Sequence, residues 1–366
     1  MVGWGATVRE IDALATLFDS VVHIAPLHRG PAPGSSLPYR APNVRLHAVP
    51  PTGGLRWWDK SKILLRYPDY VRAILLERGK ADVVHIRTPA NIGMVSLLFF
   101  GLVRRPRARW AKYAGDWQRE RPEPWSYRIQ KWWLKNNLHR GMVTINGRSP
   151  EAAPHIHSFL NPCLTEGELE QGAAASRDKD LRQPVRLVFV GRLEAVKGVG
   201  VCLEVLAQLQ RARVGASLDL IGEGREQPRF EQQARNLGIS SGVNFHGGLA
   251  RGLLGQFYAQ AHFILLPSSA SEGWPKVLSE AMAYGAVPIA SPVGSISEHL
   301  GRFEVGRVIQ AREACAFTQT IEDYLANSAL WQEESIKAVR AARQFSYTNY
   351  LVAVRDLLKL PAPSQN

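Results

Sequence analysis

The second half of the chain alternates short apolar segments with helical patterns, and this alternation limits the fold more than any other feature. Between the apolar segments lie helical patterns such as Val199 to Ala212 and Gly252–Gln260. Such alternation predicts a parallel, doubly wound α/β sheet, whose ligands bind at the carboxyl ends of the strands. The five expected strands are Val185–Val190, Ser217–Ile221, Val243–His246, Phe263–Leu266 and Val287–Ala290.

The first half shows a similar rhythm, with strand-like segments at Ser20–Pro26, Val44–Val49, Asp82–Arg87, Arg109–Tyr113 and Met142–Ile145. A chain of 366 residues favours two domains. We expect a domain over 1–170, a linker over 171–184, a second domain over 185–345, and a C-terminal helix and tail over 346–366. The linker holds Asp178-Lys179-Asp180, which has the spacing of a metal motif. Because the segment is polar, we expect these side chains to be solvated and predict no metal site.

The start of the chain lacks an expected strand. Met1 to Thr7 is typical of a glycine loop that opens a helix running to about Phe18. In a doubly wound domain an apolar strand precedes such a loop and is central in the sheet. Because almost nothing precedes the loop here, we expect a truncated chain or a mis-assigned start codon.

Charge and tryptophan are concentrated in the first half. The whole chain has a net charge of +13, and residues 1–150 carry 24 Lys and Arg against 10 Asp and Glu. Eight of the ten tryptophans precede residue 134, including Trp57-Trp58 and Trp132-Trp133. Such a half suits an acidic partner, either a membrane surface, a phosphate-bearing lipid or a nucleic acid. The alternative is a solvated basic face with the tryptophans in the core.

Membrane-spanning and disulfide-rich classes do not fit the sequence. The longest apolar stretch, Ile92 to Val103, is shorter than the roughly 18 residues that span a bilayer, so we expect a buried helix there. We see no secretory signal. Cys163, Cys202 and Cys315 are odd in number and far apart, so we expect reduced core residues in a cytoplasmic protein.

Two carboxylates, Glu272 and Glu280, lie eight residues apart around Gly273-Trp274-Pro275. Proline fits the first helical position, so we expect a helix from Pro275 with Glu280 about two turns inside it. A helix N-terminus between the two carboxylates would bind phosphate. The segment therefore suits a nucleotide-sugar, which carries hydroxyls on both sides of its phosphates. The alternative is an ordinary loop–helix junction with two solvated glutamates.

A basic loop follows the first strand of the second domain. It reads Gly191-Arg192-Leu193-Glu194-Ala195-Val196-Lys197-Gly198. Glycines permit close backbone approach, and two cations can neutralise a diphosphate leaving group. This loop and the Glu272–Glu280 segment converge on the same edge of one predicted sheet.

At this point the chain resembles the family-4 retaining glycosyltransferases with the GT-B fold. Ser295 departs from the pattern, because a second glycine is usual there. In the first half the resemblance rests mainly on the strand rhythm. The matching residues, in the family's order over 185–310, are Gly191-Arg192-x4-Lys197-Gly198, Gly222-x-Gly224, Phe245-x-Gly247, Glu272-Gly273-Trp274-Pro275-x4-Glu280-Ala281 and Pro292-Val293-Gly294-Ser295-x2-Glu298.

The resemblance implies two doubly wound, Rossmann-like domains facing across a cleft, with the C-terminal helix crossing back to the first domain. It implies hexosyl transfer from a nucleotide-sugar with retention of configuration, without metal or cofactor. Arg192 and Lys197 would hold the donor diphosphate, with Glu280 on the ribose and Glu272 facing the transferred sugar. The remaining donor-binding positions are Gly191, Gly222, Gly273, Trp274, Pro275 and Lys276.

The family often has a histidine near the transferred sugar in the first domain, in the loop after Arg109–Tyr113. Here that loop reads Ala114-Gly115-Asp116-Trp117, without histidine. Asp116 and Arg87 are the available catalytic candidates. His85, in mid-strand among apolar neighbours, is expected to be a core histidine.

The first domain normally binds the acceptor. Its basic charge and tryptophans suit a saccharide linked to polyprenyl phosphate, at the inner face of the cell membrane, in polysaccharide assembly such as that of lipopolysaccharide. A GT-B nucleotide-sugar epimerase is an alternative, which the Glu272/Glu280 spacing disfavours. A nucleic-acid-binding protein is a second alternative, but no zinc-ligand spacing or single-strand-binding aromatic motif supports it.

Overall fold

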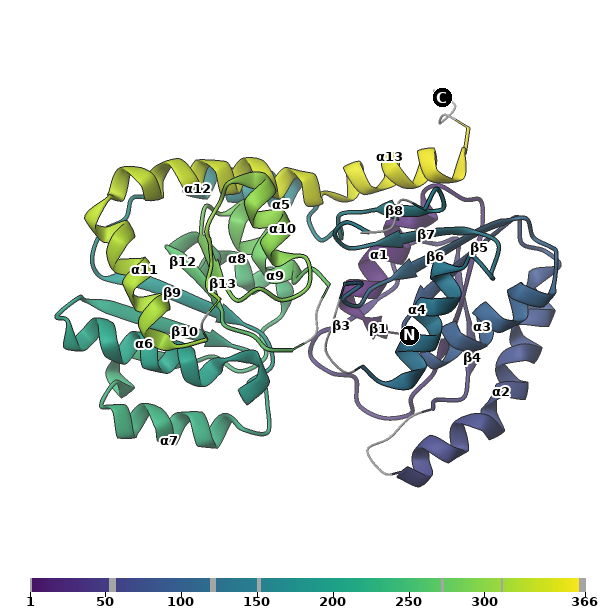
Figure 1. The fold of residues 1–366 in the computed structure, drawn as a ribbon, viewed down its shortest axis with the longest axis horizontal. Helices are drawn as coiled ribbons and strands as arrows, with labels where there is room; N and C mark the ends of the chain where they lie inside the picture. Colours follow the sequence, from purple (N-terminus) through teal and green to yellow (C-terminus); the bar gives the residue numbers. More distant parts are fainter. Residues whose placement is uncertain are drawn as a thin grey trace. The chain divides into compact units, whose positions relative to one another are not determined.

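The computed structural model describes residues 2–52, 57–118, 123–149, 153–270, 273–310 and 312–361, with backbone alone for 57–64. The chain forms two compact units: unit 1 comprises residues 1–159 and 351–366, and unit 2 comprises residues 160–350. Both are built on parallel sheets flanked by helices (Figure 1). The predicted α/β fold is therefore confirmed.

Unit 2 contains one six-stranded parallel sheet in the order β11-β10-β9-β12-β13-β14. The five expected strands lie within one residue of their predicted bounds, and β14 is an additional short edge strand. The strands are β9 (Val185–Val190), β10 (Ala216–Ile221), β11 (Val243–Phe245), β12 (Phe263–Leu266), β13 (Val287–Ala290) and β14 (Arg307–Val308).

Helices cover both faces of this sheet, and every residue of β12 and β13 is buried, as expected of strands in a two-sided parallel sheet. The helices are α5 (Glu166–Ser176), α6 (Val199–Arg211), α7 (Gln227–Leu237), α8 (Arg251–Gln260), α9 (Lys276–Ala283), α10 (Ile296–Phe303), α11 (Ala314–Ala326) and α12 (Ser328–Ala342), with short 3₁₀ turns η1 (Ala195–Lys197), η2 (Ser240–Gly242) and η3 (Arg343–Phe345).

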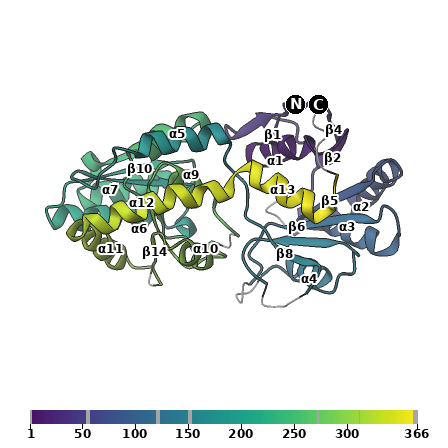
Figure 2. The ribbon, with the colours of Figure 1, turned by 90° about the horizontal axis from the view of Figure 1, so that it is seen from above.

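Unit 1 has a more divided architecture. Its strands are β1 (Val2–Trp4), β2 (Val21–Pro26), β3 (Ser36–Pro38), β4 (Val44–Val49), β5 (Val83–Thr88), β6 (Ala108–Tyr113), β7 (Met142–Ile145) and β8 (Ile156–Ser158). Its helices are α1 (Gly5–Ala15), α2 (Trp57–Arg78), α3 (Asn91–Leu102), α4 (Trp125–Lys135) and α13 (Tyr347–Leu358), which enters unit 1 at Leu351. In Figures 1 and 2, α2 and α3 lie side by side.

The parallel strands of unit 1 form two sheets, β2-β4 and β5-β6-β7-β8. In the described part of the chain, no backbone pairing joins β2 to β5. A three-residue strand does precede α1, contrary to the expectation, but β1 pairs antiparallel with β3. It therefore takes no place in either parallel sheet.

The predicted linker is helical over residues 171–176, because α5 extends through them. A capping box starts this helix: Thr165 Oγ1 accepts from the Glu168 backbone N–H, and Glu168 Oε2 accepts from the Thr165 backbone N–H at 2.8 Å. At Gly172 the helix lies so close to α9 that a Cβ would stand 2.4 Å from the Ala283 carbonyl oxygen. The chain passes between the units at residues 159 and 160 instead.

Two further expectations need correction. Lys179 is not a solvated linker residue, because its Nζ donates to the backbone carbonyls of Tyr258, Ala261 and Tyr284. These carbonyls end α8 and α9, where helical partners are lacking. Cys163 and Cys202 are buried as expected, whereas Cys315 is exposed; all three thiols are free.

Candidate functional site

The loops after β9, β10 and β11 are joined at the carboxyl edge of the unit 2 sheet. Gly191 follows β9 and its N–H donates to the Ile221 carbonyl at 2.9 Å. Gly222 follows β10 and its N–H donates to the Gly247 carbonyl at 2.8 Å. The predicted motifs that follow these strands are therefore neighbours in space.

Glycine is required at two of these positions. Gly222 has φ +142°, and a Cβ there would stand 1.9 Å from the Gly191 carbonyl oxygen. Gly198 has φ +83°, and its Cβ would stand 2.3 Å from the Pro267 carbonyl oxygen. Side chains rarely adopt such φ values, so only glycine lets these loops approach each other. The motif glycines thus shape the edge of the sheet.

The basic loop presents its two cations differently. The Arg192 side chain is 65% exposed and pairs with Glu194 at 2.6 Å. Lys197 ends η1 and is half-buried. Ser269, in the loop after β12, donates its backbone N–H to the Val196 carbonyl at 2.7 Å. The loop is therefore anchored to the segment that leads into the Glu272–Glu280 motif.

Within that motif, Glu272 lies outside the described residues. Helix α9 begins at Lys276, one residue later than expected, and Pro275 is its N-cap. The Gly273 carbonyl accepts from the Ser295 backbone N–H at 2.9 Å and from the Ser295 hydroxyl at 3.1 Å. Ser295, which replaces the usual glycine, thus holds the loop before α9.

Trp274 is a core residue. Its ring stacks on Phe345 with centroids 5.0 Å apart, and its indole N–H donates to Ser279 Oγ at 2.7 Å. The side chain is 3% exposed. The side chain is therefore unavailable to a ligand, so the donor role expected at this position is left to its backbone.

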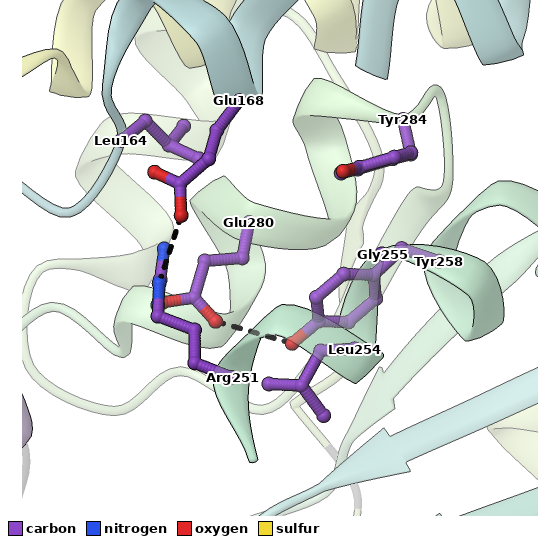
Figure 3. Close-up of a pocket in the computed structure, with 8 residues that line it drawn as sticks. All are labelled: Leu164, Glu168, Arg251, Leu254, Gly255, Tyr258, Glu280 and Tyr284. Atoms are coloured by element: carbon purple, nitrogen blue, oxygen red, sulfur yellow. Dashed lines mark hydrogen bonds and ion pairs between the residues drawn. The ribbon is translucent and has the colours of Figure 1, made fainter. Parts of the chain in front are cut away.

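Glu280 lies in a small pocket with a cavity volume of about 20 Å³, roughly the room of one water molecule (Figure 3). It is 5% exposed, its Oε1 pairs with Arg251 Nη1, and its Oε2 accepts from the Tyr258 hydroxyl at 3.2 Å. It is therefore no solvated glutamate. The other residues that line the pocket are Leu164, Glu168, Leu254, Gly255 and Tyr284.

The pocket contains three polar groups that sequence reasoning missed: Arg251, Tyr258 and Glu168. Burial opposes the charge of Arg251, but Glu280 and Glu168 raise its pKa above the ordinary value. Burial, followed by the Glu280 charge, raises the pKa of Tyr258, so its hydroxyl stays a donor. The Thr165-x-x-Glu168 capping signature was visible in the sequence and would have placed a helix start here.

In unit 1, Arg87 belongs to a charged cluster at the carboxyl edge of β5 and β6. Glu10 Oε1, on α1, pairs with Arg87 Nη1 at 2.9 Å and with Lys112 Nζ at 2.7 Å. The Glu10 side chain is buried, whereas that of Arg87 is 30% exposed. Arg87 is therefore the member of the cluster that solvent reaches best.

Asp116 lies on the neighbouring loop. The Ala114 backbone N–H donates to the Thr88 carbonyl at 2.7 Å, which joins the loops after β5 and β6. Asp116 Oδ1 accepts from the Gln118 backbone N–H at 3.1 Å, and its carbonyl accepts from Lys131 Nζ at 3.0 Å. His85 stacks on Trp110, with ring centroids 3.9 Å apart, and burial lowers its pKa to about 3. This agrees with the expected core histidine.

The chain as a whole matches solved structures in fold. Sucrose-phosphate synthase from Thermosynechococcus elongatus aligns with a TM-score of 0.74 at 19% identity, over 96% of this chain and 91% of that one. WaaG, a glycosyltransferase involved in lipopolysaccharide biosynthesis, aligns with a TM-score of 0.64 at 16% identity, over 97% and 96%. The fold is GT-B. Anabaena HepE in complex with UDP and glucose aligns with this GT-B chain at a TM-score of 0.70 and 16% identity, over 98% and 96%.

The family-model match lies in the second half of this GT-B chain. Residues 175–345 match the family model for glycosyl transferases group 1. Glycogen synthase of Mycobacterium tuberculosis is 30% identical over 161 residues, 44% of this chain and 38% of that protein. D-inositol 3-phosphate glycosyltransferase of Streptomyces coelicolor is 24% identical over 179 residues, 46% of this chain and 39% of that protein. The matches thus span about two fifths of each curated relative's length.

Proposed function

We propose that this chain is a retaining, metal-independent glycosyltransferase of family 4. It would transfer a hexosyl group from a nucleotide-sugar to a lipid-linked saccharide in cell-surface polysaccharide assembly. The observation that carries the proposal is the joined sheet edge of unit 2, where the basic loop is anchored to Ser269, ahead of the Glu272–Glu280 motif, within the segment that matches the group 1 glycosyl transferases.

The donor would bind at this edge. Arg192 and Lys197 would neutralise the departing nucleoside diphosphate, and the backbone N–H groups at the start of α9 would face phosphate or sugar hydroxyls. Glu280 would accept hydrogen bonds from the ribose, and Glu272 would face the transferred sugar. With the cations and the helix N-terminus supplying positive potential, no metal is required.

Nucleotide binding is tested by thermal denaturation with UDP, GDP, ADP and dTDP. A bound nucleotide raises the melting temperature, because ligand that binds the native state stabilises it. We expect one nucleotide to stabilise the wild type and to lose its effect on the R192A/K197A double variant. R235A, which removes an exposed arginine of α7 that bonds Gln232, is the control. The proposal fails if no nucleotide stabilises the wild type, or if the double variant responds like the control.

The stereochemistry and the metal requirement are tested on the product. NMR of the transferred sugar should show the anomeric configuration of the donor, and EDTA should leave the rate unchanged. Inversion, or loss of activity that Mg²⁺ restores, would contradict these parts of the proposal. Release of free epimerised sugar without transfer would favour the epimerase.

Arg87 and Asp116 are proposed to act on the acceptor from unit 1. Arg87 and Lys112 both pair with Glu10, and the Arg87 side chain is 30% exposed, so its guanidinium is the cation of this group that solvent reaches. Such a site suits an acceptor that carries phosphate, as a polyprenyl-phosphate-linked saccharide does.

We also propose that unit 1 places the enzyme on the cytoplasmic face of an anionic membrane. Its α3–α4 patch comprises the exposed residues Leu98, Leu102, Trp125, Ile129 and Trp132, with Arg104, Arg105 and Arg128. Trp125 is 71% and Leu102 86% exposed. Neither α3 nor α4 contains Asp or Glu.

The two helices meet where a Cβ on Gly101 would stand 2.8 Å from the Trp133 ring. By helical spacing, Leu98 and Leu102 share one face of α3, and Trp125, Ile129 and Trp132 share one face of α4. Tryptophan and leucine enter the lipid interface while arginine pairs with anionic head groups. In the described part of the chain no helix is long and apolar enough to cross a bilayer.

Vesicle flotation tests the patch. We expect the wild type to float with vesicles of phosphatidylglycerol and phosphatidylcholine, and not with phosphatidylcholine alone. W125A/W132A should stay at the bottom, whereas I336A, which removes an exposed apolar side chain of unit 2, should float. Equal flotation of both variants would exclude the α3–α4 patch as the membrane contact, and binding to RNA in place of vesicles would favour a nucleic-acid partner.

A further inference from the structure

Arg251 joins three segments of unit 2 in the pocket of Figure 3. From the first position of α8, its Nε donates to Glu168 of α5 at 3.0 Å and its Nη2 donates to the Cys163 carbonyl at 2.7 Å. Its Nη1 pairs with Glu280 of α9. One side chain thus connects the region before α5, helix α5 itself and the proposed ribose-binding carboxylate.

This contact matters because Glu280 is buried. A carboxylate that has left water keeps its charge only when a cation or several donors compensate the lost hydration. In the pocket, Arg251 is the cation and Tyr258 adds one hydroxyl donor. The remaining walls near Glu280 include Leu164, Leu254 and Gly255, which offer no charge.

Glu168 is the second carboxylate in the pocket. It is 29% exposed, and its second oxygen is engaged by the N-terminus of α5 through the Thr165 backbone N–H. With two carboxylates and one guanidinium, the pocket keeps a net charge of −1. Arg251 and Tyr258 each occupy one position on a different oxygen of Glu280, and a carboxylate has about four such positions. Glu280 can therefore still accept hydrogen bonds from a ligand.

We propose that Arg251 is a positioning residue for nucleotide binding. It supplies the positive charge opposite Glu280 and holds the side chain in one orientation, so that the carboxylate accepts hydrogen bonds from the vicinal ribose hydroxyls of a nucleoside diphosphate. This inference rests on the proposed donor site. Arg251 does not touch the reacting sugar; it acts through Glu280.

The groups that face Glu280 come from every element around it. Helix α8 contributes Arg251 and Tyr258, and α5 contributes Glu168. The preceding segment contributes Cys163, whose pKa burial raises to about 12. Lys276 and Tyr284 lie at the two ends of α9 itself. Burial also raises the pKa of Tyr284, with the Glu168 charge adding to it. Loss of Arg251 therefore leaves proton uptake by Glu280 as the expected change near neutral pH.

The test compares dissociation constants at pH 6 and pH 8 by calorimetry, with whichever of UDP, GDP, ADP and dTDP stabilises the wild type. The nucleotide's own phosphate titrates in this range, so each variant is compared with the wild type at the same pH. We expect R251M to bind about tenfold more weakly at pH 6 than at pH 8 relative to the wild type, a difference of about 1.4 kcal/mol in binding free energy. R251K, which keeps the charge, should retain the wild-type ratio with a weaker affinity at both pH values.

The R251M/E280Q double variant shows whether Glu280 is the source of the pH dependence in R251M. We expect its affinity to show no pH dependence beyond that of the wild type, because no titrating carboxylate remains at position 280. The proposal is overturned if the ratio of the dissociation constants at pH 6 and pH 8 is the same in R251M as in the wild type. It is also overturned if R251M and the double variant show the same pH dependence. If R251M does not fold, a wild-type-like ratio in R251K supports the proposal and a raised ratio overturns it. Failure of the wild type to bind any nucleotide would instead refute the donor site itself.

Discussion

Both units are built on parallel sheets flanked by helices, but they differ in the size of their sheets and in their apolar cores. Unit 2 has one six-stranded parallel sheet with a large apolar core, and its buried carboxylates, Glu280 and Glu334, lie on helices α9 and α12. Unit 1 has two shorter parallel sheets and a smaller core, and it buries Glu10, Lys112 and Arg109. The comparison teaches that both units bury ion pairs, but unit 1 sets them beside a smaller apolar core, so it has less packing to offset the loss of one.

The largest expected effect is on nucleotide affinity, which should depend on Glu280 in unit 2 and not on Arg87 in unit 1. Glu280→Ala removes the proposed ribose acceptor, and two charge-assisted hydrogen bonds of about 1.5–3 kcal/mol each correspond to a loss of about a hundredfold or more in affinity. Arg87→Ala should leave the nucleotide dissociation constant within a factor of about two while lowering the transfer rate. Calorimetric titration and product assays measure both. Full nucleotide affinity in E280A would remove the ribose assignment, and lost affinity in R87A would show that donor binding is not confined to unit 2.

The next effect tests the buried ions of unit 1. Glu10→Ala leaves Lys112 without its buried carboxylate, and breaking such a pair costs about 3–5 kcal/mol. We expect the unit 1 transition in differential scanning calorimetry to fall well below that of unit 2, so that two transitions separate. Asp69→Ala, which breaks an exposed ion pair on α2, is the control and should change little. A single unshifted transition in E10A would contradict the importance of the cluster.

A smaller effect concerns the helices that frame the Glu280 pocket. Lys179→Met leaves the terminal carbonyls of α8 and α9 without their shared donor, at a cost of about 1–3 kcal/mol. The melting temperature of unit 2 should fall while that of unit 1 stays constant. Lys337→Met removes an exposed lysine of α12 and should leave both transitions in place. Equal effects of the two variants would mean that Lys179 is an ordinary surface residue.

The smallest expected difference between the units is in how their stability changes at acidic pH. Burial lowers the pKa of His23, His85 and His139 in unit 1 to about 4, 3 and 4, and of His262 and His299 in unit 2 to about 4. The unfolded chain, with a histidine pKa of 6.5, binds more protons than the folded one between these values. Stability should therefore fall as pH drops from about 6.5 to 4, more steeply for unit 1. Calorimetry across this range at constant ionic strength measures the two slopes, and a steeper slope for unit 2 would reverse the comparison.

Much of unit 2 could be predicted because its signals are local. The apolar runs of β12 and β13 have their expected bounds, since strands buried on both faces must be apolar throughout. The positions of Gly198 and Gly222 followed from loops that meet at one sheet edge. The two-residue β14 and three-residue β1 and β3 escaped prediction, because segments this short carry almost no periodicity.

The environments of the site residues were less predictable. Trp274 belongs to a donor-site motif but stacks on Phe345, more than seventy positions away in the sequence. Lys179 lies in a polar segment, yet it donates to the ends of two later helices. In both cases the partner is distant along the chain, so local composition pointed to the wrong surroundings.

By itself the sequence determined that unit 2 is a doubly wound sheet, and it placed Arg192, Lys197 and Glu280 at the carboxyl edge of that sheet or just beyond it. These properties depend on hydrophobic period, glycine positions and helix starts, which act over a few residues. Tertiary structure alone decided that Glu280 is buried with Arg251 and Glu168, and that Glu10 joins Arg87 and Lys112. Ion pairs form between side chains that folding brings together, and residues about 30 to 110 positions apart in the chain leave no shared local pattern from which to infer them.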